Sequence, residues 1–112
     1  MDCLFCKIAA GEIPSTKVFE NDDVYAFLDI APQAPFHAVI IRKKHIKCAD
    51  EITPENSGII AKIFEAIAII SKQEGLENGY RIVNNCGEDG GQTVGQLHFH
   101  MLGRRALAWP PG

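Results

Sequence analysis

The sequence predicts an α+β domain in which one long helix covers an antiparallel sheet. Apolar residues recur at helical spacing across a single stretch of about 21 residues, between Thr53 and Gly75. Elsewhere, short β-branched and aromatic runs are joined by connections of hairpin length, which is typical of antiparallel pairing. The chain has 112 residues, the size of one domain, so we expect residues 1–112 to form a single unit.

The shorter elements follow from local residue choice. Leu4, Phe5 and Ile8 give residues 3–10 the apolar spacing of a short helix, which Gly11 ends. Runs rich in β-branched and aromatic residues, bounded by turn-forming residues, are expected to be strands. These predicted strands are residues 18–20, 24–29, 37–41, 80–84 and 97–102.

The long helix has recognisable ends in the sequence. Thr53 is a hydroxyl N-cap, Pro54 suits the first helical position and Glu55 places an acid in the first turn. Gly75 is the expected C-cap. One apolar face would pack on the sheet. That face consists of Ile60, Ile63, Phe64, Ile67 and Ile70.

Composition limits the classes of function. Hydrophobic residues make up 46% and charged residues 22%, as in soluble globular proteins. A formal net charge of −3 disfavours a broad nucleic-acid interface, and the apolar run 67–70 is far too short to span a membrane. The first residues lack the basic and apolar regions of a secretory signal. We therefore expect a cytoplasmic protein whose four cysteines are metal ligands or free thiols.

The strongest local signal lies in the last predicted strand. Side chains alternate between the two faces of a strand, so Gln96, His98 and His100 share one face, which we expect to line a cleft. The intervening apolar side chains would face the core. They are Leu97, Phe99 and Met101.

Two histidines on one strand face suit phosphoryl-transfer chemistry. One neutral imidazole can attack phosphorus, and the other can donate a proton to an oxygen or to the leaving group. Two half-exposed histidines without a role, or a metal-binding pair, also fit this spacing. His37, alone at the start of a strand, is more typical of a structural residue.

A glycine-rich loop precedes the two histidines. Gly87, Gly90 and Gly91 allow backbone N–H groups to converge on an anion, and Thr93 adds a hydroxyl donor. The acidic side chains at 88–89 disfavour phosphate binding by this loop unless they point away from it. The alternative is that the loop is a plain turn without a ligand.

The cysteines give a second candidate site. Cys3 and Cys6 are three residues apart and can chelate one Zn²⁺, with His45 as a third ligand and Gln96 or a water as the fourth. A buried pair of free thiols fits this spacing equally well. The two remaining cysteines have no evident partner spacing and are expected to be free; they are Cys48 and Cys86.

Taken together, these residues resemble the histidine triad (HIT) family, in particular its Hint branch of purine nucleoside phosphoramidases. The resemblance extends over nearly the whole chain, so residues 1–112 are interpreted as one HIT domain. The segments that carry it are Phe5-Cys6-Lys7-Ile8, Gly11-Glu12-Ile13-Pro14, Ala26-Phe27-Leu28-Asp29-Ile30, Pro32-Gln33-Ala34-Pro35, Lys43-Lys44-His45-Ile46, Asp89-Gly90-Gly91-Gln92-Thr93-Val94, His98-Phe99-His100 and Trp109-Pro110-Pro111-Gly112.

The resemblance implies a homodimer that binds a purine nucleotide of the AMP or GMP type. Asp29 would hold the ribose hydroxyls, and apolar side chains would surround the base. The implied base contacts are Phe5, Ile8, Phe27 and Ile30, and the implied phosphate contacts are Asn85, Gly91, Thr93, His98 and His100.

The resemblance also implies a reaction, hydrolysis of the P–N bond in nucleoside 5′-phosphoramidates without a cofactor for catalysis. His98 would be the nucleophile and would form a nucleotidyl-histidine intermediate, with His37 behind the site in a histidine relay. Trp109, near the C-terminus, would approach the partner subunit's site.

One departure from the family pattern bears on both candidate sites. The first histidine of the triad is replaced by Gln96, which can form hydrogen bonds but cannot carry a proton at neutral pH. In related bacterial members that histidine is a zinc ligand beside Cys3, Cys6 and His45. Two further hypotheses follow: a purine nucleotide-binding protein with weakened or lost catalysis, and a zinc-dependent fold with no nucleotide role.

Overall fold

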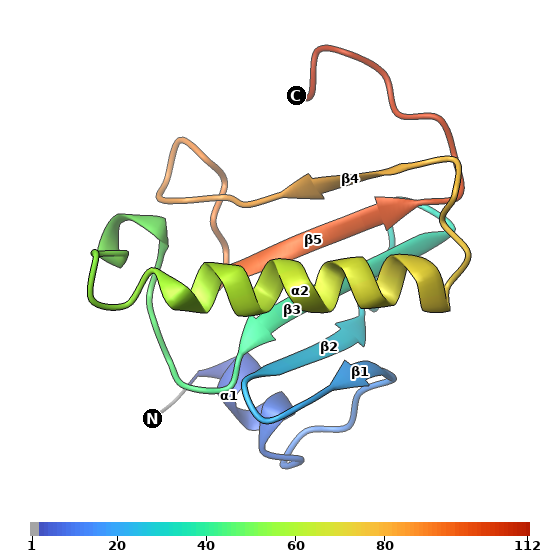
Figure 1. The fold of residues 1–112 in the computed structure, drawn as a ribbon. Helices are drawn as coiled ribbons and strands as arrows, with labels where there is room; N and C mark the ends of the chain where they lie inside the picture. The colour runs from blue at the N-terminus through green and yellow to red at the C-terminus, as the bar shows by residue number, and fades with distance from the viewer. Residues whose placement is uncertain (1–2) are drawn as a thin grey trace.

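The computed structural model describes residues 3–112 and contains one five-stranded sheet with a long helix across one face (Figure 1). The strands are ordered β1-β2-β3-β5-β4, and every neighbouring pair is antiparallel. The α+β prediction is therefore confirmed. The elements are α1 (Leu4–Ala9), β1 (Lys17–Glu20), β2 (Val24–Leu28), β3 (Phe36–Arg42), the 3₁₀ turn η1 (Ala49–Glu51), α2 (Gly58–Gln73), β4 (Tyr80–Val83) and β5 (His98–Gly103).

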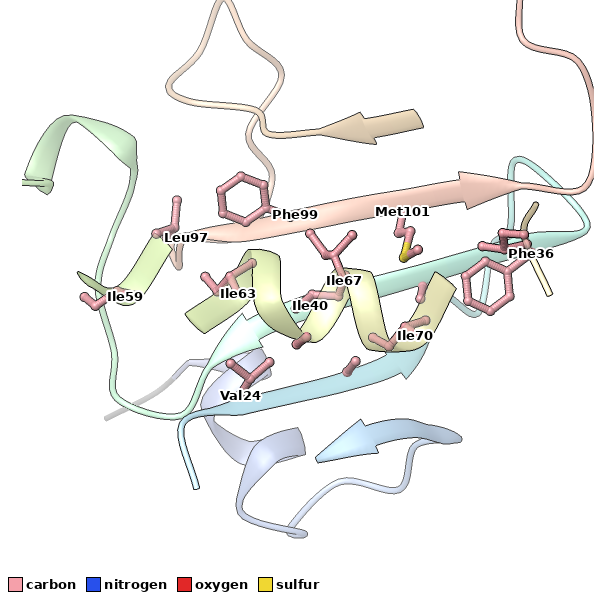
Figure 2. Packing of buried hydrophobic residues seen from close by; sticks show 14 of the residues in the cluster. Val24, Phe36, Ile40, Ile59, Ile63, Ile67, Ile70, Leu97, Phe99 and Met101 are labelled. Atoms are coloured by element: carbon pink, nitrogen blue, oxygen red, sulfur yellow. The ribbon is translucent and has the colours of Figure 1, made fainter. Parts of the chain in front are cut away.

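The main core lies between α2 and the sheet. Figure 2 shows Ile63, Ile67 and Ile70 of α2 directed at the apolar side chains of the strands below. The alternation predicted for the last strand is confirmed, because its three apolar side chains belong to this core. These are Leu97, Phe99 and Met101.

A second, smaller cluster covers the opposite face of the sheet. Its members from β2 and β3 alternate with those that face α2, so they lie on the other side. Phe5 and Ile8 of α1 pack against Phe27 and Val39 there. This cluster forms the floor on which the candidate site is built.

The long helix is shorter than the sequence predicted. It begins at Gly58 and has 16 residues, because residues 53–57 fold into a separate turn. The Asn56 side-chain oxygen accepts the Thr53 N–H at 2.6 Å, and the Thr53 carbonyl accepts the N–H of Ser57 at 2.9 Å. This turn precedes the helix, so Ser57 and not Thr53 stands at the N-cap of α2.

The C-terminal end of α2 agrees with the prediction. Gly75 follows the helix with a φ of 67°, the left-handed conformation that favours glycine. Among residues 3–112, no helix combines the length and apolar character needed to span a bilayer.

Candidate active site

His98 is fixed by the backbone of its own strand. Its Nδ1 lies 2.7 Å from the Gln96 carbonyl oxygen, which can only accept, so Nδ1 carries the proton. The edge-to-face contact with the Phe5 ring, at 4.9 Å between centroids, holds the plane of the imidazole. In the neutral ring, Nε2 is then the nitrogen with the free lone pair.

A chain of hydrogen bonds gives His100 the opposite arrangement. The backbone N–H of Gln33 donates to Nδ1 of His37 at 3.0 Å, so the proton of neutral His37 is on Nε2. That nitrogen lies 2.8 Å from Nδ1 of His100, which must therefore accept. The proton of neutral His100 is left on Nε2. The two strand histidines thus offer one acceptor and one donor, with ring centroids 5.0 Å apart.

All three histidines are biased towards the neutral form. Burial lowers the pKa of His37 and of His98 below the ordinary 6.5. The Asp29 charge raises both pKa values in part, and the Gln96 carbonyl also raises that of His98, but burial outweighs these effects. Burial also lowers the pKa of His100, and the positive charges of the neighbouring His98 and His37 would lower it further. At neutral pH this environment maintains the nucleophilic form of His98.

The imidazoles of His98 and His100 line a cavity of about 290 Å³, whose other walls come from α1, the end of β2 and the middle of β3. Eight of the ten residues expected to contact a nucleotide line it, namely Phe5, Ile8, Phe27, Asp29, Ile30, Thr93, His98 and His100. The Asp29 carboxylate stands at the cavity, with Oδ1 accepting the Ala31 N–H at 2.8 Å and Oδ2 3.6 Å from His37 Nε2. The cavity joins an apolar wall to a polar end, as nucleotide pockets require.

Two expected contacts lie outside this lining: Asn85 and Gly91. The Gly91 N–H donates to the Glu88 carbonyl at 3.0 Å within the loop, so it is not free for a ligand in this conformation. The loop is braced by Gln92, whose Oε1 accepts the Gly87 N–H at 3.0 Å. Gly90 is required by packing, since a Cβ there would lie 2.5 Å from the Cys86 carbonyl oxygen.

Sequence reasoning missed two contributors to the site. The Gln33 contribution is a backbone N–H, which no residue-type pattern reveals. The Asn84 side chain donates to the His98 carbonyl at 2.9 Å and ties the end of β4 to the strand of the nucleophile. An asparagine at the end of a predicted strand indicates a side chain that can bond a neighbouring backbone. Which backbone it bonds depends on the order of the strands.

Gln96 does not line the cavity with its side chain, contrary to the expectation from strand alternation. β5 begins at His98, and the fully buried Gln96 side chain turns towards the cysteines. Its Nε2 donates to the Arg42 carbonyl at 3.0 Å, so its oxygen points at the sulfurs, 2.8 Å from Cys3 Sγ and 3.2 Å from Cys6 Sγ. Its backbone carbonyl, in contrast, contacts His98.

The cysteine cluster has the composition of a zinc site. The ligand atoms of Cys3, Cys6 and His45 lie within 4.8 Å of one another, and His45 Nδ1 is 3.3 Å from Cys6 Sγ. Burial and the neighbouring Cys3 thiol raise the pKa of Cys6 to about 11. Cysteine and histidine side chains are typical zinc ligands, so these three donors fit Zn²⁺. The buried Gln96 amide would supply an oxygen, whereas a nitrogen or sulfur ligand is usual in such a site.

Comparison with known proteins identifies the family. The family model described as the HIT domain matches residues 10–107. The chain belongs to the HIT family. Among solved structures, a HIT family hydrolase from Legionella pneumophila superposes with a TM-score of 0.96 at 49% identity, covering 99% of this chain and 100% of the other. The predicted family is thereby confirmed.

Two plant proteins are also similar to this chain in sequence. A 14 kDa zinc-binding protein of Brassica juncea is 42% identical over 99% of this chain and 100% of its own length. The adenylylsulfatase HINT1 of Arabidopsis thaliana is 41% identical over 97% of this chain and 76% of its own length. Both matches span nearly all of the sheet and the candidate site.

Proposed function

We propose that this HIT protein hydrolyses purine nucleoside 5′-phosphoramidates through a nucleotidyl intermediate on His98. The observation that carries the proposal is the opposite protonation of two neighbouring imidazoles. His98 presents a lone pair on Nε2, and His100 presents an N–H on the corresponding atom. A P–N bond needs both, a nucleophile for phosphorus and a proton for the departing amine.

The reaction proceeds in two balanced steps. His98 Nε2 attacks phosphorus and the P–N bond breaks, while the N–H on Nε2 of neutral His100 donates a hydrogen bond to the departing nitrogen, which takes its proton from solvent and leaves as the amine. Water then attacks the phosphorus of the nucleotidyl-histidine and releases one proton to solvent. The P–N bond to His98 breaks, the nucleoside monophosphate leaves, and both histidines regain their starting forms.

The cavity supports a nucleotide as the substrate. The Asp29 carboxylate at its rim can accept hydrogen bonds from ribose hydroxyls, and the apolar wall formed by Phe5, Ile8 and Phe27 can pack against a base. Ile30, fully exposed at 101%, would be covered by that base. Thr93 would donate to the phosphate, while Asn85 and Gly91 would contact it only after a loop rearrangement.

The first experiment is hydrolysis of adenosine 5′-phosphoramidate by the natural chain and by His98→Ala, with AMP binding measured in parallel. We expect turnover in the natural chain, none in the variant, and AMP binding in both. Equal turnover in both would refute His98 as the nucleophile. AMP binding without turnover by the natural chain would favour the alternative, a nucleotide-binding protein whose catalysis was lost with the triad histidine.

The cysteine cluster supports a structural zinc site in addition. Cys3, Cys6 and His45 would hold the metal with the Gln96 amide oxygen or a water, and the ion would stabilise the fold near α1 without joining the reaction. Catalysis itself requires no cofactor. Metal analysis of protein purified without chelator tests this site, and the absence of bound zinc would refute it.

A homodimer built on β4 and α2 is also part of the proposal. β4 is an edge strand of the sheet (Figure 1). Phe64 of α2 is 44% exposed, and its ring contacts that of Phe99 in β5. Trp109 is 80% exposed, and the preceding Ala108 carbonyl accepts from Arg81 of β4 at 2.9 Å. If a partner subunit binds at this edge, Trp109 would approach the partner subunit's site.

A further inference from the structure

The fold brings together two cysteines that are far apart in the sequence. Cys48 immediately precedes η1, and Cys86 begins the glycine-rich loop after β4. Their sulfur atoms and an Asp50 carboxylate oxygen all lie within 4.8 Å of one another. Both thiols are half-buried and are free of disulfides in this structure. Both cysteines are free, as expected, but their spacing in the sequence gave no sign of this proximity, which depends on how the two loops pack.

The two loops are already held in register beside the thiols. The Gln92 amide donates through Nε2 to the Lys47 carbonyl at 2.9 Å and accepts the Gly87 N–H through Oε1 at 3.0 Å. Lys47 directly precedes Cys48, and Gly87 directly follows Cys86. One side chain therefore fixes the distance between the two backbones at the position of the cysteines.

The sulfur atoms of Cys48 and Cys86 lie within 4.8 Å of each other, and this separation is the geometric basis for a bond between them. The backbone of Asp50 lowers the pKa of the Cys48 thiol, but burial and the neighbouring Cys86 thiol outweigh it, so the pKa is raised.

We propose that Cys48 and Cys86 form a reversible intramolecular disulfide when the chain meets a small disulfide oxidant such as glutathione disulfide. One cysteine thiolate attacks the glutathione disulfide and releases one glutathione thiolate, leaving a mixed disulfide. The second cysteine thiolate attacks the protein sulfur of that mixed disulfide and releases the second glutathione. The protein loses two hydrogen atoms in total, and one glutathione disulfide becomes two reduced glutathiones.

The disulfide would reinforce the bridge made by Gln92. It would tie residues 84–95, which carry Asn85 and Thr93, covalently to the segment before η1. A metal at this place is less favoured, because the third ligand is the exposed Asp50 and no fourth donor joins the group within residues 3–112.

The test is a redox titration of the full-length chain in glutathione buffers after treatment with a chelator. Thiols are trapped by alkylation and the chain is digested for peptide mapping. We expect a linked Cys48–Cys86 peptide, formed in at least about tenfold larger fraction in the folded chain than in urea, because the fold supplies the proximity. In Cys48→Ser, Cys86 should carry a single glutathione instead.

Two outcomes would overturn the inference. Separate glutathiones on Cys48 and Cys86 of the folded chain would show that the sulfurs cannot meet. Thiols that remain reduced in the folded chain, under conditions that oxidise the urea-unfolded chain, would show that the fold prevents the bond. Peptide mapping distinguishes a Cys3–Cys6 disulfide from a Cys48–Cys86 disulfide. Oxidation of Cys3 and Cys6 alone would therefore also count against the proposed Cys48–Cys86 disulfide.

Discussion

His37 Nε2 lies 2.8 Å from His100 Nδ1, and this contact decides which nitrogen of His100 faces the cavity with a proton. The tautomer of His37 is itself fixed by the backbone, because the Gln33 N–H donates to Nδ1 of His37. Donors and acceptors therefore alternate without a break from the 31–35 segment to the cavity. The donor that the reaction needs is set before any substrate binds.

The first prediction separates the donor from the nucleophile. In His37→Ala the tautomer of His100 is no longer fixed, so hydrolysis of adenosine 5′-phosphoramidate should slow by about tenfold or more in kcat. The 4-nitrophenyl ester of AMP releases 4-nitrophenolate, which needs no proton to depart, and its hydrolysis should be affected much less. The measurement is kcat for both substrates.

The matched control is Gln33→Ala, which removes the side chain but keeps the N–H that donates to His37. It should retain the kcat of the natural chain. Equal slowing of the two substrates in His37→Ala would contradict a role in stabilising the departing amine nitrogen.

The second prediction concerns pH. Burial lowers the pKa of His98 below 6.5, so kcat/KM should stay level from neutral pH down to about 6.5 and fall only below it, as His98 becomes protonated. The Asp29 charge raises this pKa, so Asp29→Asn should move the acid limb to still lower pH. The measurement is the pH profile of kcat/KM.

A conservative control for this profile is Asp22→Asn, an exposed residue in the turn between β1 and β2. Its acid limb should coincide with that of the natural chain. A limb that moves to higher pH in Asp29→Asn would disprove the electrostatic assignment.

The third prediction concerns the metal site. The Gln96 amide offers a neutral oxygen to the cysteine cluster, whereas an imidazole is a preferred zinc ligand. Gln96→His should therefore tighten zinc binding by about tenfold or more, measured by competition with a chromophoric chelator. Cys6→Ser should weaken it. Unchanged affinity in Gln96→His would mean that this side chain does not reach the metal.

The fourth prediction addresses the dimer. Phe64→Glu places a charge on the α2 flank next to β5 and β4 and should dissociate the homodimer, as measured by sedimentation velocity. Ile69→Glu is the matched control, since Ile69 is 48% exposed on the opposite flank, about 140° around the helix. Dissociation by both variants, or by neither, would argue against an interface at this edge.

Local sequence determined the type of the helices and strands and the inward face of the last strand. Alternation placed Phe99 and Met101 in the core, and the helical repeat placed Ile63 and Ile67 there, because these periods follow from backbone geometry alone. The same local rules misplaced the start of α2, since the residues after Thr53 form a separate turn and Ser57 precedes the first residue of the helix.

Tertiary structure decided what the candidate site residues do. Three features of the structure depend on contacts between residues 38 to 93 positions apart in the sequence. They are the direction of the Gln96 side chain, the contact of His37 with His100 and the proximity of Cys48 to Cys86. No local pattern specifies them, because they arise from the order of the strands and the packing of loops at their ends. Sequence alone supplied the chemical groups, and the sheet determined which nitrogen, oxygen or sulfur each group presents.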